Sequence, residues 1–266
     1  MIDRGDVLGK LLATAREASA IVMRVYGEED VGAELKGPND PVTRADREAN
    51  ALIVARLARD FPGVPIVAEE SDPSTYANFG AASEALFVDP VDGTRDFIER
   101  DGEFCVMIGF TEAGVATVGV VLCPVFQKTY TGIVGVGAFC NDSPIAASTT
   151  ARLEDARCAV SRFHRSRSVD EKLARLACKE LVPVGSAGIK GAYVASGELD
   201  VFAHPSNGPM KLWDSCAPCA IVTAAGGILT DATGRPYDYR GPVAQGNGTL
   251  AANALLHPEA VRRFGS

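Results

Sequence analysis

Two acidic residues, Asp89 and Asp92, stand three positions apart in the segment Asp89–Thr94, whose sequence is DPVDGT. The apolar run Leu86–Val88 before this segment predicts a short buried strand that ends at Asp89. Two carboxylates on one turn repel each other unless a cation lies between them, and the Val91 carbonyl offers a third oxygen. Hard divalent cations such as Mg²⁺ prefer carboxylate and carbonyl oxygens. The segment therefore indicates a cation site, and the alternative for such a pair is a solvated turn with a helix cap.

Two more acidic residues stand at the expected ends of elements. Glu69 ends the apolar run Val64–Ala68, twenty residues before Asp89. Asp214 follows Trp213 and precedes an apolar helix, where a helix cap explains it equally well. Taken together, four acids at strand ends and helix starts indicate a site for two cations.

The residues after Asp92 have the properties of an anion site. Gly93 permits a tight turn with close approach of the backbone. A short helix is expected over Thr94–Ile98, and its free backbone N–H groups would face an anion. Upstream, Thr43–Asp46 is typical of a capping box that opens another helix, which gives Asp46 a structural explanation.

The hydrophobic pattern predicts the elements that position these residues. Apolar residues recur at spacings of three and four over residues 7–25, which predicts an amphipathic helix, and a second helix follows the capping box. Short apolar runs then predict an antiparallel meander with strands at Val106–Thr111, Val115–Leu122 and Lys128–Ile133.

After about Ala151 short strands and helices alternate, which is typical of a layered α/β arrangement. Strands are expected at Cys158–Ser161, Val182–Val184, Leu199–Phe202, Ile228–Thr230 and Thr249–Ala252, and helices at Val169–Lys179, Ile189–Ser196, Ser215–Ala225 and Pro258–Phe264. We expect a single domain over residues 1–266 of α/β class, an α+β layered sandwich, with sub-halves 1–150 and 151–266.

Composition limits the partners of the chain. Its 266 residues carry a formal charge of −8, whereas proteins that bind nucleic-acid phosphates are normally basic, so no nucleic-acid polymer is expected. Apolar stretches such as Val115–Cys123 are far shorter than the roughly 20 residues of a membrane-spanning helix. The N-terminus has no signal-peptide pattern, and the seven cysteines are scattered. We therefore expect no membrane contact and a cytoplasmic location, where thiols stay reduced.

The segments Glu69–Ser71, Asp89–Thr94 and Trp213–Asp214 resemble, in order and over nearly the whole chain, the signature motifs of the inositol monophosphatase superfamily. Its members are Mg²⁺-dependent, lithium-sensitive phosphomonoesterases. The resemblance implies an αβαβα arrangement, phosphoric monoester hydrolase activity on a small phosphorylated substrate, two or three Mg²⁺ ions as cofactors, and a homodimer.

The resemblance also implies roles for individual residues. The metal ligands would be Glu69, Asp89, the Val91 carbonyl, Asp92 and Asp214, of which Asp92 and Asp214 would also contact the substrate. Gly93 and Thr94 would hold the phosphate through backbone amides. Thr94 and Asp46 would be the catalytic pair that orients the attacking water.

Three stretches favour the 3′(2′),5′-bisphosphate nucleotidase branch of the superfamily. Asp92–Phe104 is similar to its D-G-T-K-E-F-I…R-x-G-E-F pattern, Ser161–His164 to its S-R-S-H, and Gly185–Lys190 to a loop of animal nucleotidases. The resemblance implies that the substrate is contacted by His164, Gly185, Ser186 and Lys190, with Lys190 on a phosphate and His164 near the sugar or base. The substrate would be 3′-phosphoadenosine 5′-phosphate, cleaved to AMP and phosphate by metal-activated water.

The chain departs from bacterial nucleotidases at two places. Many of them carry G-S-S-L-K where this loop has Ala187 and Gly188, and an arginine is missing after Asp200–Phe202. The alternative enzyme is an inositol-1-monophosphatase or a sugar-phosphate phosphatase on the same scaffold. A distant alternative is a non-catalytic phospholigand-binding protein. Simpler explanations of His164 and Lys190 are a surface loop residue and a solvated lysine at a helix start.

Overall fold

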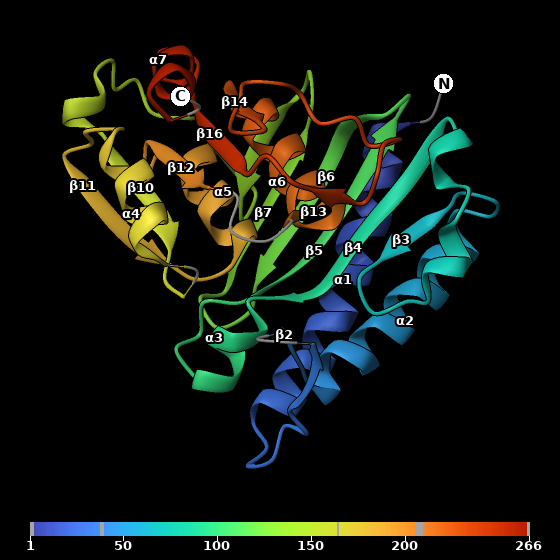
Figure 1. Ribbon diagram of the computed structural model, residues 1–266. Helices are drawn as coiled ribbons and strands as arrows, with labels where there is room; N and C mark the ends of the chain where they lie inside the picture. The colour runs from blue at the N-terminus through green and yellow to red at the C-terminus, as the bar shows by residue number, and fades with distance from the viewer. Residues whose placement is uncertain (1–2, 38–39, 164, 206–209, 265–266) are drawn as a thin grey trace.

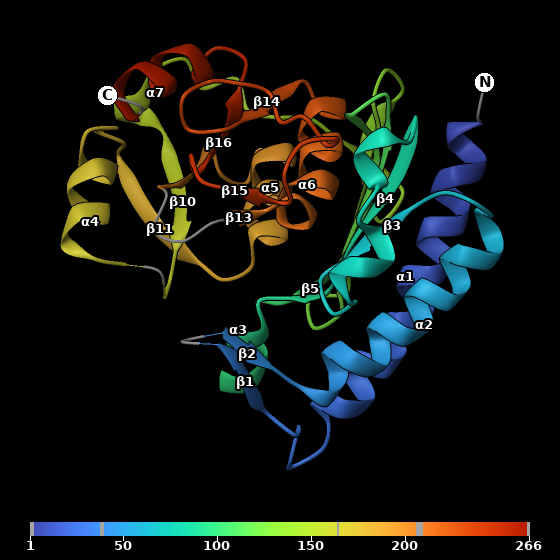
Figure 2. The same cartoon turned by 45° about the vertical axis from the view of Figure 1, so that its right-hand side comes forward.

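Layers of helices and sheets alternate through the molecule (Figure 1, Figure 2). The computed structural model describes residues 3–37, 40–163, 165–205 and 210–264. The helices are α1 (Arg4–Tyr26), α2 (Arg44–Asp60), α3 (Thr94–Glu99), α4 (Arg167–Ala174), α5 (Ala187–Ala195), α6 (Leu212–Ala224) and α7 (His257–Phe264). Figure 2 shows α1 and α2 on one face of a large sheet, α5 and α6 between the two sheets, and α4 and α7 beyond the small sheet. This order confirms the expected αβαβα arrangement.

The large sheet carries two of the acidic strand ends. In spatial order its strands are β3 (Ile66–Ala68), β4 (Glu84–Asp92), β5 (Cys105–Glu112), β6 (Val115–Cys123), β7 (Lys128–Ile133), β8 (Gly137–Cys140) and β9 (Ser143–Ile145). β3 and β4 are parallel, and each later pair is antiparallel. The expected meander is confirmed, and it continues through β8 and β9, which the sequence pattern did not predict.

The small sheet lies in the second part of the chain. In spatial order its strands are β11 (Glu180–Val184), β10 (Arg157–Ser161), β12 (Val201–His204), β16 (Thr249–Asn253) and β14 (Gly227–Thr230). Two short antiparallel pairs complete the fold, namely β1 (Glu34–Gly37) with β2 (Asp40–Val42) and β13 (Met210–Lys211) with β15 (Ala244–Gln245). The strands of the large sheet all precede residue 150 and those of the small sheet all follow it. The single domain with two sub-halves stays a prediction.

The first two helices form as their sequences dictate. The apolar stripe of α1 is buried at each of the positions expected for its core face, and Gly27 caps its last turn. Thr43 is the N-cap of α2, and its side chain and that of Asp46 form the expected capping box. Both helices pack on the large sheet in one continuous apolar cluster. Among the residues described, none of the helices combines the length and apolar composition needed to cross a bilayer.

Several boundaries differ from those expected. β4 does not end at Asp89 but continues to Asp92, with an irregular register between these two residues. α4 ends at Ala174 instead of Lys179, and Ala177, just beyond it, has a positive φ of 52° that no helix tolerates. α6 begins three residues earlier than expected, at Leu212.

A row of glycines brings α6 close to the large sheet. Gly109 on β5 pairs with Gly119 on β6, which pairs with Gly132 on β7. A Cβ atom on Gly119 would overlap the Ala217 carbonyl of α6, and one on Gly132 would lie 2.7 Å from the Ile221 Cα. The backbone of α6 therefore rests directly on the backbone of the strands, and this contact sets the depth at which α6 presents its first turn.

This contact predicts opposite effects for two glycine-to-alanine substitutions. Gly119→Ala should lower the free energy of unfolding by about 1–3 kcal/mol, because the added methyl group overpacks the contact between strand and helix. Gly9→Ala is the matched control. Gly9 lies on α1, and a Cβ atom there would meet no neighbouring side chain or strand within 4 Å. It should raise the free energy of unfolding by about 0.5–1 kcal/mol. Urea unfolding of both variants measures the difference, and equal effects would contradict the close contact.

Candidate active site

Glu69 and Asp89 leave neighbouring strands at the same end. In the parallel pair of β3 and β4, Ala68 lies opposite Val88, so the next residue of each strand emerges at one edge. The Glu69 backbone N–H donates to the Val88 carbonyl at 3.1 Å, which fixes that edge. The twenty residues that separate the two acids in sequence therefore become a distance of one strand spacing.

A bulge in β4 sets the direction of the backbone between Asp89 and Asp92. Asp89 pairs with Met107 and Asp92 with Cys105, so β4 has one residue more than β5 over this stretch. The Val91 backbone N–H donates to Asp89 Oδ1 at 3.1 Å. Gly93 then adopts a φ of 92°, where a side chain would be strained and its Cβ would lie 2.8 Å from the Glu103 carbonyl. This turn starts α3 immediately after the acidic pair.

Thr94 and Asp46 are in direct contact, although forty-eight residues separate them in sequence. Thr94 Oγ1 lies 3.0 Å from Asp46 Oδ1 and 3.1 Å from the Val91 carbonyl oxygen, both of which can accept its proton. The other oxygen of Asp46 accepts from the Thr43 N–H at 2.8 Å and from the Thr43 hydroxyl. The capping box and the contact with Thr94 thus use different oxygens, so the structural explanation of Asp46 and the catalytic one are compatible.

Asp214 lies in the first turn of α6 and is not its N-cap, which is Lys211. Its Oδ2 accepts the Lys211 backbone N–H at 2.7 Å. The glycine row places this turn against the large sheet near the end of β4. Asp214 is therefore not the N-cap considered for it but the third residue of the helix, where its carboxylate accepts the backbone N–H of the N-cap residue.

Electrostatics show that the structure brings these acids together. Burial raises the pKa of Asp89 well above its usual range, and Glu69, Asp92, Asp214 and Asp46 raise it further. Burial, followed by Glu69 and Asp92, has the same effect on the pKa of Asp214. Each carboxylate thus lies within the field of the others.

The pKa shifts of the two flanking acids lead to the same conclusion. Burial raises the pKa of Glu69 to about 7, against the opposing effect of Lys36. Burial raises the pKa of Asp46 to about 6, while the hydrogen bonds from Thr43 and Thr94 oppose that rise. Acids that are buried or half-buried beside one another favour bound cations, since a cation removes both the repulsion and part of the desolvation cost.

The carboxylates are turned toward protein donors. Asp92 Oδ2 accepts from the Gly188 N–H at 2.7 Å and from the Ser186 hydroxyl, and Glu69 Oε1 accepts from Lys36 Nζ at 2.9 Å. As oriented, no three His, Cys, Asp or Glu side chains in the described part of the chain surround a common point. The residues nevertheless fit a hard divalent cation. If the carboxylates rotate away from these donors, all the ligands that they and the Val91 carbonyl offer are oxygen atoms, which such a cation prefers.

Lys36 was missed by the sequence analysis. It lies on β1, and its ammonium group bridges Glu69 and Glu70. In the sequence it begins the polar stretch Lys36–Pro41, which contains one glycine and two prolines. Turn residues between two short extended runs are the signal of a hairpin, and that signal could have located Lys36 beside the acids.

The second half of the chain contributes the loop Gly185–Ser186. Ser186 is the N-cap of α5, with a φ of 44°, and its hydroxyl contacts Asp92 and accepts the Ile189 N–H at 3.1 Å. This loop therefore adjoins the acids as expected. The strained Ser186 conformation is stabilised by these two bonds.

Lys190 is not solvated as its simpler explanation required. It is 5% exposed, and its Nζ donates to the carbonyls of Gly185 at 2.8 Å and Val184 at 3.2 Å. Burial lowers its pKa to about 8, which Asp92 and Asp96 oppose. A contact between Lys190 and a phosphate stays a prediction and requires the ammonium group to exchange a carbonyl for the ligand. His164 lies outside the described residues.

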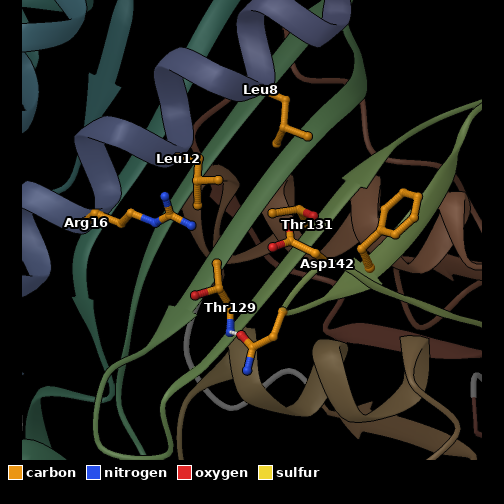
Figure 3. A pocket seen from close by; sticks show the side chains of 8 residues that line it. Leu8, Leu12, Arg16, Thr129, Thr131 and Asp142 are labelled. Atoms are coloured by element: carbon orange, nitrogen blue, oxygen red, sulfur yellow. Dashed lines mark hydrogen bonds between the residues drawn. The ribbon is translucent and has the colours of Figure 1, made fainter.

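A cavity elsewhere has none of this chemistry. It encloses about 480 Å³ between α1, which contributes Leu8, Leu12 and Arg16, and β7, which contributes Thr129 and Thr131 (Figure 3). None of the predicted site residues lines it. Volume alone therefore does not identify the active site, because catalysis of phosphate transfer needs converging charges rather than space.

Several known proteins are similar to this chain over most of its length. The 3′(2′),5′-bisphosphate nucleotidase CysQ of Escherichia coli K12 is 33% identical over 237 residues, which are 88% of this chain and 94% of that protein. The fructose-1,6-bisphosphatase/inositol-1-monophosphatase of Thermotoga maritima is 31% identical over 98% of this chain and 95% of that protein. The solved structure of the extragenic suppressor protein suhB from Bartonella henselae has a TM-score of 0.85 at 28% identity and covers 97% of this chain and 98% of its own.

The sequence profile of the inositol monophosphatase family matches residues 5–264. The match includes each of the acidic strand ends and helix starts described above. This chain therefore belongs to the inositol monophosphatase family, a family of phosphatases.

Proposed function

We propose that the protein is a Mg²⁺-dependent phosphomonoesterase that hydrolyses 3′-phosphoadenosine 5′-phosphate to AMP and phosphate. The observation that carries the phosphatase activity is the buried Asp89, which lies in the field of Glu69, Asp92 and Asp214 close to the contact between Thr94 and Asp46. The nucleotide substrate is supported by the motifs of residues 92–104 and 161–164 and by the 33% identity to CysQ.

The proposed cofactor would be held by Glu69, Asp89, the Val91 carbonyl, Asp92 and Asp214. Bound Mg²⁺ would neutralise the phosphate charge and activate a water molecule. Family members are generally metal-dependent, which supports this cofactor, while the number of ions and the homodimer stay predictions.

Thr94 and Asp46 would position the attacking water and receive its proton. The Thr94 hydroxyl has one proton and can donate it to Asp46 while a lone pair accepts from the water. As the water oxygen bonds to phosphorus, the bond from phosphorus to the ester oxygen would break, and the leaving oxygen would take a proton from solvent water. The proton of the attacking water would move to Thr94 Oγ1, and the Thr94 proton would move to Asp46 Oδ1. A pKa of about 6 suits Asp46 to this role, since a base is most effective when its pKa is near the working pH.

An inositol or sugar monophosphatase is the second candidate. It is supported by the relative from Thermotoga maritima, whose name includes both activities. The orientation of Lys190 also favours a monophosphatase. A bisphosphate substrate needs a basic group for its second phosphate, and the ammonium group of Lys190 is already bonded to two backbone carbonyls.

Removal of a central ligand should abolish most of the activity. Asp89→Asn should lower kcat/KM roughly 1,000-fold or more with Mg²⁺ present, because phosphate transfer depends on charge neutralisation and loss of one stabilising group already costs 100- to 1,000-fold elsewhere. Asp238→Asn is the matched control. Asp238 is exposed and pairs with Arg240, so this variant should keep full activity.

The same pair of variants tests the metal without an activity assay. Mg²⁺ at about 100 times its Kd should stabilise the wild type and the control variant by about 2.7 kcal/mol, measured as a rise in Tm. Asp89→Asn should show a much smaller rise. Near-normal turnover of Asp89→Asn, or an undiminished Mg²⁺ effect on its Tm, would refute the metal assignment.

The Thr94 hydroxyl should be needed for turnover rather than for binding. Thr94→Val keeps the shape but removes the hydroxyl, so kcat should fall roughly 100- to 10,000-fold, the range for a lost general acid–base contact. Thr94→Ser retains the hydroxyl and should keep most of the activity. Steady-state kinetics of the two variants decide the role, and equal kcat values would exclude the proton path through Thr94.

Substrate identity is tested by direct comparison. Purified protein with Mg²⁺ is assayed for phosphate release from 3′-phosphoadenosine 5′-phosphate and from inositol 1-phosphate. We expect the nucleotide to give the higher kcat/KM. A preference for the inositol ester would select the second candidate, and no release from either ester or from a panel of sugar phosphates would favour a non-catalytic phospholigand-binding protein.

A further inference from the structure

Arg162, directly after β10, contacts three carboxylates from a different part of the chain. Its guanidinium group lies 2.9 Å from Asp96 Oδ1 and 2.7 Å from Glu103 Oε2, and it also pairs with Asp101. Asp96 lies on α3, and the other two acids lie in the connection from α3 to β5. Arg162 therefore ties the end of a strand in the small sheet to the segment that follows the DPVDGT turn.

The same acids hold the loop on the other side of the site. Glu103 Oε2 accepts the Gly185 backbone N–H, so one carboxylate oxygen joins Arg162 to this loop. Gly185 also packs on Asp96 so closely that a Cβ there would overlap the Asp96 carboxylate. From within the protein, Lys190 Nζ donates to the Gly185 carbonyl at 2.8 Å. Gly185 is thus held at its N–H, its Cα and its carbonyl by charged groups.

This network connects the two proposed walls of the active site. One wall is the turn at Gly93–Thr94, whose Gly93 lies against the Glu103 carbonyl. The other is Gly185–Ser186, whose serine hydroxyl contacts Asp92. Arg162 bonds the acids between the two walls and has no contact among those described with Asp89, Thr94 or Asp46.

The balance of charge makes Arg162 necessary for this arrangement. Burial and the neighbouring Asp101 raise the pKa of Asp96 to about 7, and Arg162 opposes that rise. Asp96 keeps only 4% of its side chain exposed, so water cannot replace Arg162 there. A guanidinium group can bond several carboxylates at once in one plane, whereas a lysine ammonium group is a point charge on a flexible stem.

We propose that Arg162 is a positioning residue that sets the separation of the two walls and thereby the fit of the organic part of the substrate. The proposal rests on the proposed phosphomonoesterase site and does not depend on which ester is hydrolysed. It also relates two stretches with nucleotidase-like sequences, because Arg162 of the second stretch is the ion-pair partner of three acids in residues 95–104.

The experiment compares Arg162→Gln and Arg162→Lys with the wild type. Arg157→Gln is the matched control, because Arg157 stands at the other end of β10 and pairs with Glu180 at 3.1 Å on the surface. Each protein is assayed on whichever phosphate ester the wild type hydrolyses best. Amide hydrogen exchange over residues 183–190 is measured without substrate, so this readout does not require activity.

We expect Arg162→Gln to raise KM roughly 10- to 100-fold with a smaller change in kcat, the range expected when positioning is lost without loss of a reacting group. Exchange of the Gly185 amide should become about tenfold faster, since its acceptor Glu103 is no longer held. Arg162→Lys should recover part of both effects. Arg157→Gln should change neither.

Two results would overturn the proposal. The first is an unchanged KM together with unchanged exchange in Arg162→Gln. The second is a loss confined to kcat, which would make Arg162 part of the reaction chemistry. If Arg162→Gln does not fold, Arg162→Gln/Asp101→Asn removes part of the repulsion and is measured instead, with the same two outcomes. A wild type that hydrolyses no ester would refute the proposed function, and the exchange data alone would then decide the positioning role.

Discussion

Several carboxylates converge beside the ends of β3 and β4, some buried and some half-buried, and their mutual repulsion is the constraint around which the site is organised. Asp89 is 2% exposed, and its pKa is raised by this burial, by Asp92 on the same strand and by three acids from three other segments, Glu69, Asp214 and Asp46. The folded chain keeps these acids close despite their repulsion because its backbone structure holds each of them in place. Glu69 and Asp89 are held by a parallel strand pair, Asp92 by a bulge, and Asp214 by the first turn of a helix.

Basic side chains around these acids form a second set of contacts. Lys36 contacts Glu69 and Glu70, while Arg162 contacts the acids beyond α3. Each basic group reduces the net negative charge near the proposed phosphate site. The protein therefore combines an acidic centre suited to cations with basic residues at its margin, which is compatible with its formal charge of −8.

Local patterns predicted the elements well, whereas contacts between distant segments could not be predicted. The capping box at Thr43 and the meander strands follow from spacings within a few residues, and both are present. The apolar run Leu86–Val88 predicted a strand that ends at Asp89, but a bulge keeps β4 paired as far as Asp92.

Partners of the site residues were harder to predict for a physical reason. Which donor reaches Asp92, or which acids surround Arg162, depends on how two sheets and the helices between them are packed, and no short spacing encodes that packing. Lys190 illustrates the difference: a position near the start of a helix was expected and it lies on α5, but its burial against two carbonyls comes from tertiary packing. Isolated glycines inside expected strands were a usable signal of close approach that the sequence analysis did not use.

The glycine row under α6 has a consequence for heat tolerance. A contact between two backbones contains few side-chain torsions. Rising temperature can therefore gain little side-chain entropy at this contact. Layers packed through leucine and isoleucine can loosen by side-chain rearrangement before they unfold, whereas at Gly119 and Gly132 the backbone of the strand meets the backbone of α6 and leaves little such freedom. Asp214 should therefore keep its height above the sheet until the strands themselves separate.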